Sequence, residues 1–126
     1  MNYEVIIKTD VADRPEDHEL SAALILANHF KANAIFLRPE MRRTPDVNIN
    51  GILWEIKSPR GGGKKTIDNN FRTARKQSKN IVLDLRRIKM HKTQAIARIN
   101  HYLSTGPHGL TRVIIITKTA MVIEIL

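Results

Sequence analysis

Apolar residues recur along the chain at two spacings, and these spacings predict a series of helices and strands. Where they recur every three or four positions, as at Leu20, Ala23, Leu24 and Ala27, the pattern predicts a helix with one inward face. Short or alternating apolar runs predict strands instead. The predicted strands cover residues 3–8, 34–37, 46–49, 52–57, 81–85, 110–117 and 121–126, and the predicted helices cover residues 14–31, 66–79 and 92–103.

This order of elements predicts an α/β fold in which a mixed central β-sheet is flanked by helices. The length of 126 residues fits one domain, residues 1–126. The inner faces of the second and third helices are predicted to carry Ile67, Phe71, Ala74 and Ser78, and Ile96, Ile99 and Leu103. No apolar run is long enough for a membrane span, and the absence of cysteine excludes disulfides and a thiol nucleophile.

The segment from Asp46 to Lys57 carries the clearest local signal. Asn50-Gly51 favours a two-residue hairpin turn, because both residues tolerate the positive φ of a type I′ turn. The register that this turn sets brings Asp46 opposite Glu55, with Lys57 on the same face. The other face, toward the core, would carry Val47, Ile49, Ile52, Trp54 and Ile56.

Two opposed carboxylates need compensation. At a separation of about 5 Å they repel by roughly 3 kcal/mol at an effective dielectric near 20. A divalent cation between Asp46 and Glu55 would offset this repulsion, and Mg²⁺ is the ordinary ion for oxygen ligands. A metal and a neighbouring lysine, here Lys57, are the groups that phosphodiester hydrolysis uses. The alternative is a surface hairpin with an ordinary Asp–Lys ion pair.

Positive charge is concentrated in the central third of the chain. The net charge is +9, and residues 57–92 hold twelve Lys or Arg against two acids. Such a balance indicates a polyanionic partner, usually nucleic acid, although a solvated basic face is the alternative. A flexible glycine-rich loop over residues 58–65 and the helix after it would supply the contacts. The candidate nucleic-acid-binding residues are Arg60, Lys64, Lys65, Arg72, Arg75, Lys76 and Lys79.

Pro45-Asp46 followed by Glu55-Ile56-Lys57 resembles the PD-(D/E)XK motif of restriction-endonuclease-like nucleases. The wider segment from Thr44 to Pro59 is similar to the C-terminal tRNase domains of contact-dependent growth-inhibition (CDI) toxins, and the similarity extends over roughly residues 16 to 85. The resemblance implies a PD-(D/E)XK-type fold and a metal-dependent endonuclease.

The resemblance also implies roles for single residues. Asp46, Glu55 and the carbonyl of Ile56 would bind Mg²⁺ or Mn²⁺, and Lys57 would act on the attacking water. Glu19 would complete the metal shell, and Gln77 would support the site. For Glu19 the alternative is a solvated helix acid, and for Gln77 it is a surface glutamine.

Three functions compete at this point. The first is an RNA endonuclease, with tRNA favoured by the resemblance, acting as a bacterial toxin in the cytoplasm after delivery as part of a larger secreted protein. An acidic immunity protein would then be its partner. The second is a DNA endonuclease of the same fold, and the third is a nucleic-acid-binding module without catalysis. A histidine-based RNase is disfavoured, because only His91 and His101 have a workable spacing and they lie almost three turns apart.

Overall fold

The computed structural model describes residues 2–37 and 45–126. The strands are β1 (Val5–Ile7), β2 (Ala34–Phe36), β3 (Val47–Ile49), β4 (Ile52–Lys57), β5 (Asn80–Asp84), β6 (Arg112–Ile116) and β7 (Val122–Glu124). The helices are α1 (Asp17–Phe30), α2 (Thr66–Ala74) and α3 (Lys92–Ser104), with short 3₁₀ helices η1 (Val11–Asp13) and η2 (Leu85–Arg87).

The seven described strands form one sheet in the order of the sequence, β1-β2-β3-β4-β5-β6-β7. Strands joined through a helix pair in parallel, as β1 with β2, β4 with β5 and β5 with β6 do. Strands joined by a short connection, β3 with β4 and β6 with β7, pair antiparallel, as do β2 and β3. The predicted mixed sheet is therefore confirmed.

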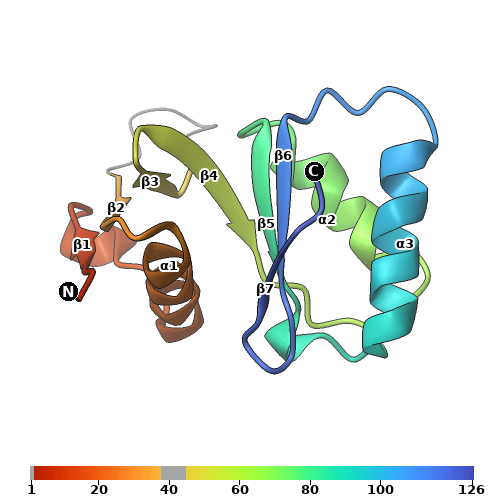
Figure 1. Cartoon of the computed structure of the whole chain (residues 1–126), viewed down its shortest axis with the longest axis horizontal. Coiled ribbons are helices and arrows are strands. Elements are labelled where there is room, and N and C mark those ends of the chain that lie inside the picture. The colour runs from red at the N-terminus through yellow and green to blue at the C-terminus, as the bar shows by residue number, and fades with distance from the viewer. Residues whose placement is uncertain (1, 38–44) are drawn as a thin grey trace.

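Helices cover both faces of this sheet. Figure 1 shows α1 on one side and α2 with α3 on the other. The sheet residues alternate accordingly: Val82 packs in the core beneath α1, whereas its neighbours Ile81 and Leu83 pack beneath α2 and α3. The same alternation along β6 separates Ile114 from Ile115, so β5 and β6 are buried on both faces.

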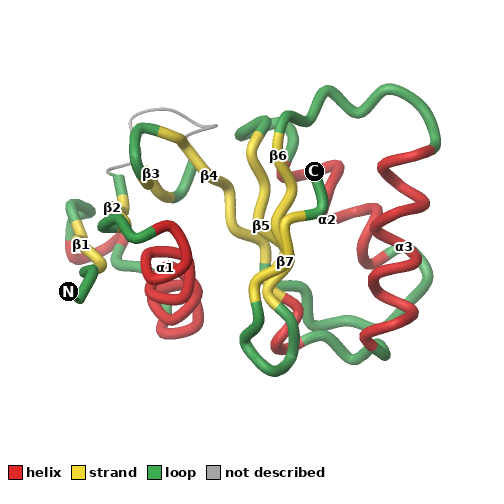
Figure 2. The backbone as a smooth tube through the Cα atoms, viewed as in Figure 1, coloured by secondary structure: helices red, strands yellow, loops and turns green. Residues whose placement is uncertain are grey.

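Strand β4 changes partner halfway along its length. Its first half, Ile52 to Trp54, pairs with β3, and its second half, Glu55 to Lys57, pairs with β5. In Figure 2 it runs diagonally between the N-terminal and C-terminal strands of the sheet. Glu55 therefore stands where the pairing of β4 with β3 ends and its pairing with β5 begins.

The hairpin register is the one predicted from Asn50-Gly51. Ile49 pairs with Ile52 and Val47 with Trp54. Asn50 and Gly51 have φ of 57° and 82°, and the Asn48 side chain accepts a hydrogen bond from the Gly51 N–H at 2.9 Å. Of the predicted core face, Val47, Ile49, Trp54 and Ile56 are buried and Ile52 is half-buried.

Several predicted boundaries were wrong, and capping or tertiary contacts explain the differences. Helix α1 begins at Asp17 rather than residue 14, because Glu16 and Glu19 form the capping box that starts it. Helix α2 ends at Ala74 rather than residue 79, because Ser78 leaves the helix to donate to the Leu53 carbonyl at 2.7 Å. The two 3₁₀ helices were not predicted.

Some predicted inward residues also differ. Leu24 is exposed, and Ala22 and Leu26 are buried in its place. In α3 the fully buried residues are Ala95 and Ile99, with Ile96 and Leu103 only partly buried. No helix in the described part of the chain combines the length and the apolarity that a membrane crossing requires.

Candidate functional site

Asp46 lies directly before β3 and joins the two strands of the hairpin through its side chain. Its Oδ2 accepts a hydrogen bond from the Ile56 N–H at 3.0 Å. The pairing of β3 with β4 ends at Trp54, so the Ile56 N–H has no partner on β3. The Asp46 carboxylate accepts its hydrogen bond in place of a strand carbonyl. The bond holds Asp46 beside Glu55, as the register predicts.

Glu55 is the most enclosed acid of the site, with 2% of its surface exposed. The ammonium of Lys57 lies 3.2 Å from its Oε2, which confirms that the two side chains share one face. In the amide orientation that satisfies both groups, the nitrogen of Gln77 donates to Oε1 at 2.7 Å and also to Oε2. Gln77 lies in the turn after α2, so this contact connects that turn to Glu55 on β4.

Burial and mutual repulsion perturb both acids. Burial, and after it the charge of Asp46, raises the pKa of Glu55 from 4.5 to about 8, against the opposing effect of Lys57. Burial also raises the pKa of Asp46, against the hydrogen bond from Ile56, with Glu19 adding to the rise. Without a metal, Glu55 is therefore mostly protonated at neutral pH and shares a hydrogen bond with Asp46.

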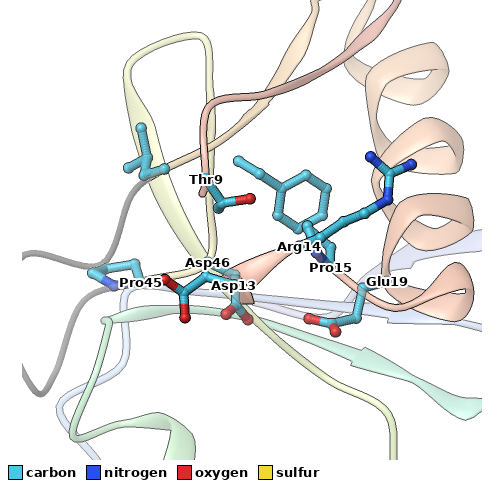
Figure 3. A pocket seen from close by; sticks show the side chains of 9 residues that line it. Thr9, Asp13, Arg14, Pro15, Glu19, Pro45 and Asp46 are labelled. Atoms are coloured by element: carbon cyan, nitrogen blue, oxygen red, sulfur yellow. The ribbon is translucent and has the colours of Figure 1, made fainter. Parts of the chain in front are cut away.

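A small pocket of about 120 Å³ opens beside Asp46. Figure 3 shows the carboxylates of Asp13, Glu19 and Asp46 around it, from η1, α1 and the residue before β3. Glu19 and Asp46 therefore border the same pocket. Asp13 was not predicted as a site residue, because the pattern Asp13-Arg14-Pro15-Glu16 indicated a helix cap there.

Glu19 also belongs to a second cluster, with Glu16 and His18, whose potential ligand atoms lie within 4.8 Å of one another. Both ring nitrogens of His18 are engaged, Nε2 with Arg87 at 3.1 Å and Nδ1 with Glu16 at 3.4 Å. This cluster is therefore a poor metal site. Among the described residues, Asp46, Glu55 and Glu19 do not form an equally compact group of three.

The donor set around Asp46 fits a hard divalent cation. It consists of oxygens, and Lys57 supplies only one positive charge for the two carboxylates of Asp46 and Glu55. The proton held by Glu55 balances the remaining charge, and a metal ion would replace it. Mg²⁺ retains several waters when bound, so Glu19 could complete the shell through one of them.

The candidate nucleic-acid-binding residues are all exposed, on the loop before α2, on α2 itself and in the turns after it. They are Arg60, Lys64, Lys65, Arg72, Arg75, Lys76 and Lys79. A second small pocket, of about 180 Å³, lies next to them and is lined by Lys57 with Asn69, Asn70 and Thr73. Lys57 therefore borders both the acid pair and a polar hollow on α2.

The glycine-rich loop is anchored rather than the free arm that its composition predicted. The Gly61 carbonyl accepts from the Lys89 N–H at 3.2 Å. A Cβ on Gly62 would come within 2.7 Å of the Lys89 carbonyl oxygen, so only glycine fits there. His91 and His101 lie at opposite ends of α3, which separates them as expected.

Fold and site together define an α/β domain whose central hairpin carries a pair of adjacent acids, Asp46 and Glu55, next to a lysine. The family model for the contact-dependent growth inhibition CdiA C-terminal domain matches residues 42–122. The chain belongs to this family, which confirms the resemblance to the C-terminal domains of CDI toxins. The PD-(D/E)XK assignment and the tRNase activity stay predictions.

A solved structure shares the fold. It is the CdiA-CT/CdiI toxin and immunity complex from Burkholderia pseudomallei, in which the similar chain is 23% identical. The match covers 97% of this chain and 98% of that one, with a TM-score of 0.70. No curated protein matches the chain.

Proposed function

We propose that this chain is a metal-dependent endonuclease that hydrolyses phosphodiester bonds in RNA, with tRNA as the first candidate substrate. The observation that carries the proposal is the acid pair of half-buried Asp46 and buried Glu55, with Lys57 at 3.2 Å from Glu55. A domain that only bound nucleic acid would have no use for two adjacent acids withdrawn from solvent in a strongly basic chain.

Each residue of the site has a distinct task in this proposal. Asp46, Glu55 and the Ile56 carbonyl would hold Mg²⁺ or Mn²⁺, with Glu19 completing the shell. The ion would polarise the phosphoryl oxygen and lower the pKa of its bound water. Lys57 would orient the attacking water and stabilise the negative charge that develops on the phosphate. Gln77 would keep the Glu55 carboxylate in place through its amide nitrogen.

The exposed bases on α2 and its loop would bind the sugar–phosphate backbone, which gives affinity without sequence information. The polar hollow formed by Asn69, Asn70 and Thr73 lies against Lys57 and would receive the nucleotide next to the scissile bond. Amide and hydroxyl groups suit this role, because single-stranded RNA is read by hydrogen bonds to splayed bases.

The proposed biological role is that of a toxin delivered as the C-terminal part of a larger protein into the cytoplasm of another cell. Family membership supports delivery, and the similar structure is a toxin in complex with an immunity protein. We expect an acidic immunity protein for this chain, because the basic segment 57–92 is the surface it would have to cover. A neutral partner that binds elsewhere would contradict this.

The test is cleavage of purified total tRNA and of plasmid DNA, with Mg²⁺, with Mn²⁺ and with EDTA. We expect metal-dependent cleavage of tRNA that Asp46→Asn and Lys57→Ala abolish. The matched controls are Glu4→Gln and Lys118→Ala, which change an exposed acid and an exposed lysine.

Three outcomes would overturn parts of the proposal. Cleavage that survives EDTA or Asp46→Asn would exclude the metal site. Cleavage of plasmid but not tRNA would favour the DNA endonuclease. Tight binding of both nucleic acids with no cleavage of either would favour the binding module.

A further inference from the structure

Arg86 and Arg87 stand apart from the other bases of the central segment. Both lie in η2, directly after β5, and both are half-buried. By composition they belong to the basic stretch that indicates a nucleic-acid partner, but their guanidinium groups are directed at other parts of the protein. Their hydrogen bonds connect α1 with β5 and with the segment after β4.

Arg86 joins β5 to α1. Its Nε and one terminal nitrogen donate to the two oxygens of Asp84, at 2.9 and 2.8 Å, and Asp84 is fully buried. Such a bidentate pair fixes the plane of the guanidinium group. The terminal nitrogens then reach α1, at the Ser21 hydroxyl (2.6 Å) and the His18 carbonyl (3.0 Å).

Arg87 joins the same helix to the end of β4. Its Nε donates to the Ser58 hydroxyl at 3.0 Å and one terminal nitrogen donates to the Ser58 carbonyl at 3.2 Å. That terminal nitrogen also lies 3.1 Å from Nε2 of His18. Ser58 directly follows Lys57, so Arg87 connects α1 to the chain at the lysine of the site.

The two arginines thereby bracket Glu19, which lies between His18 and Ser21 on α1. The helix packs most closely on β1, β2, β3 and β7. The two arginines add hydrogen-bonded links from α1 to Asp84 of β5 and to Ser58, directly after β4. We propose that Arg86 and Arg87 are positioning residues that hold Glu19 at the correct place relative to Glu55 and Lys57. This inference rests on the proposed function, because it assigns Glu19 to the metal shell.

The experiment measures metal binding without nucleic acid, as the Mn²⁺ concentration that gives half of the metal-induced rise in unfolding temperature. The informative variants are Ser21→Ala, which removes one acceptor on α1, and Arg86→Lys. Arg86→Lys keeps a positive charge beside Asp84 but loses the hydrogen bonds to the Ser21 hydroxyl and the His18 carbonyl. Replacement of groups that orient metal ligands typically weakens metal affinity about tenfold or more, and we expect about tenfold for Arg86→Lys.

Arg98→Lys is the matched control. Arg98 makes a comparable ion pair with Asp68 at 2.7 Å, between α3 and α2, with no contact to α1 or β4 among its described bonds. It should change stability without changing the half-maximal Mn²⁺ concentration.

A double-mutant cycle separates positioning from a general loss of structure. In a Glu19→Gln background, Arg86→Lys should weaken Mn²⁺ binding by less than about threefold, because the group it positions is already lost. The same tenfold loss in both backgrounds would overturn the positioning role while leaving the metal site intact. Absence of any Mn²⁺-induced shift in the wild-type protein would overturn the proposed function, and this inference with it.

Discussion

Glu55 gives the metal-free protein a pH dependence whose sign and range follow from the site. The pKa of Glu55 is about 8 in the folded protein, raised mainly by burial, against an ordinary value of 4.5. Between these values the folded state holds a proton that the unfolded state has released. Stability is therefore highest below about pH 4.5 as far as this group is concerned, and falls as pH rises through about 8.

Glu55→Gln removes this dependence, because an amide does not ionise. The difference between 8 and 4.5 sets a ceiling of about 5 kcal/mol on the effect, at 1.36 kcal/mol for each pKa unit. Lys57 is partly exposed and water reaches the site beside it, so we expect about 2–3 kcal/mol at an effective dielectric near 20.

The assay is urea unfolding in EDTA at about pH 5 and about pH 9. The free energy of unfolding of Glu55→Gln relative to wild type should rise between the two pH values by the expected amount, so that the variant is the more stable protein at high pH. Glu4→Gln, at an exposed acid, should show no such change. If wild type and Glu55→Gln follow parallel curves, the burial argument is wrong.

Three further predictions concern metal, turn and substrate. Added Mg²⁺ should stabilise the wild type increasingly from about pH 6 to 8, since it displaces the Glu55 proton, and calorimetry in buffers of different ionisation enthalpy should detect proton release; no release would contradict this. Gly51→Ala should cost about 1 kcal/mol in urea unfolding because φ is 82° there, whereas Ala at the exposed position Asn100 should cost less. Asn69→Ala should raise KM for tRNA several-fold with little change in kcat, and an unchanged KM would exclude the hollow on α2 as a substrate site.

The part of the site that the sequence predicted is local in the chain. Asn50-Gly51 sets the turn, the turn sets the register, and the register places Asp46 by Glu55 and Lys57 within twelve residues. Each step depends on backbone conformation that neighbouring residues dictate, so periodicity and turn chemistry were enough.

The rest of the site depends on contacts between distant segments. The near-complete burial of Glu55 follows from β4 passing from β3 to β5 and from Gln77 lying over it, and no local pattern encodes either. The end of α2 was missed for the same reason, because Ser78 bonds to Leu53, 25 positions away. Asp13 joins the pocket through η1, a turn that the capping pattern did not predict.

The bases of the central segment divide by burial into two groups with different roles, one structural and one available to a ligand. Net charge alone does not separate them. Arg86 and Arg87 make hydrogen bonds to Asp84, His18 and Ser58, so their guanidinium groups are poorly placed to contact phosphate. The exposed bases of α2 and its loop retain that capacity. Replacing one of the exposed bases should therefore reduce the salt dependence of nucleic-acid binding by about one ion, whereas Arg87→Lys should leave that slope unchanged and weaken Mn²⁺ binding instead. A reduced salt slope for Arg87→Lys would mean that η2 contacts the substrate directly, contrary to the positioning role.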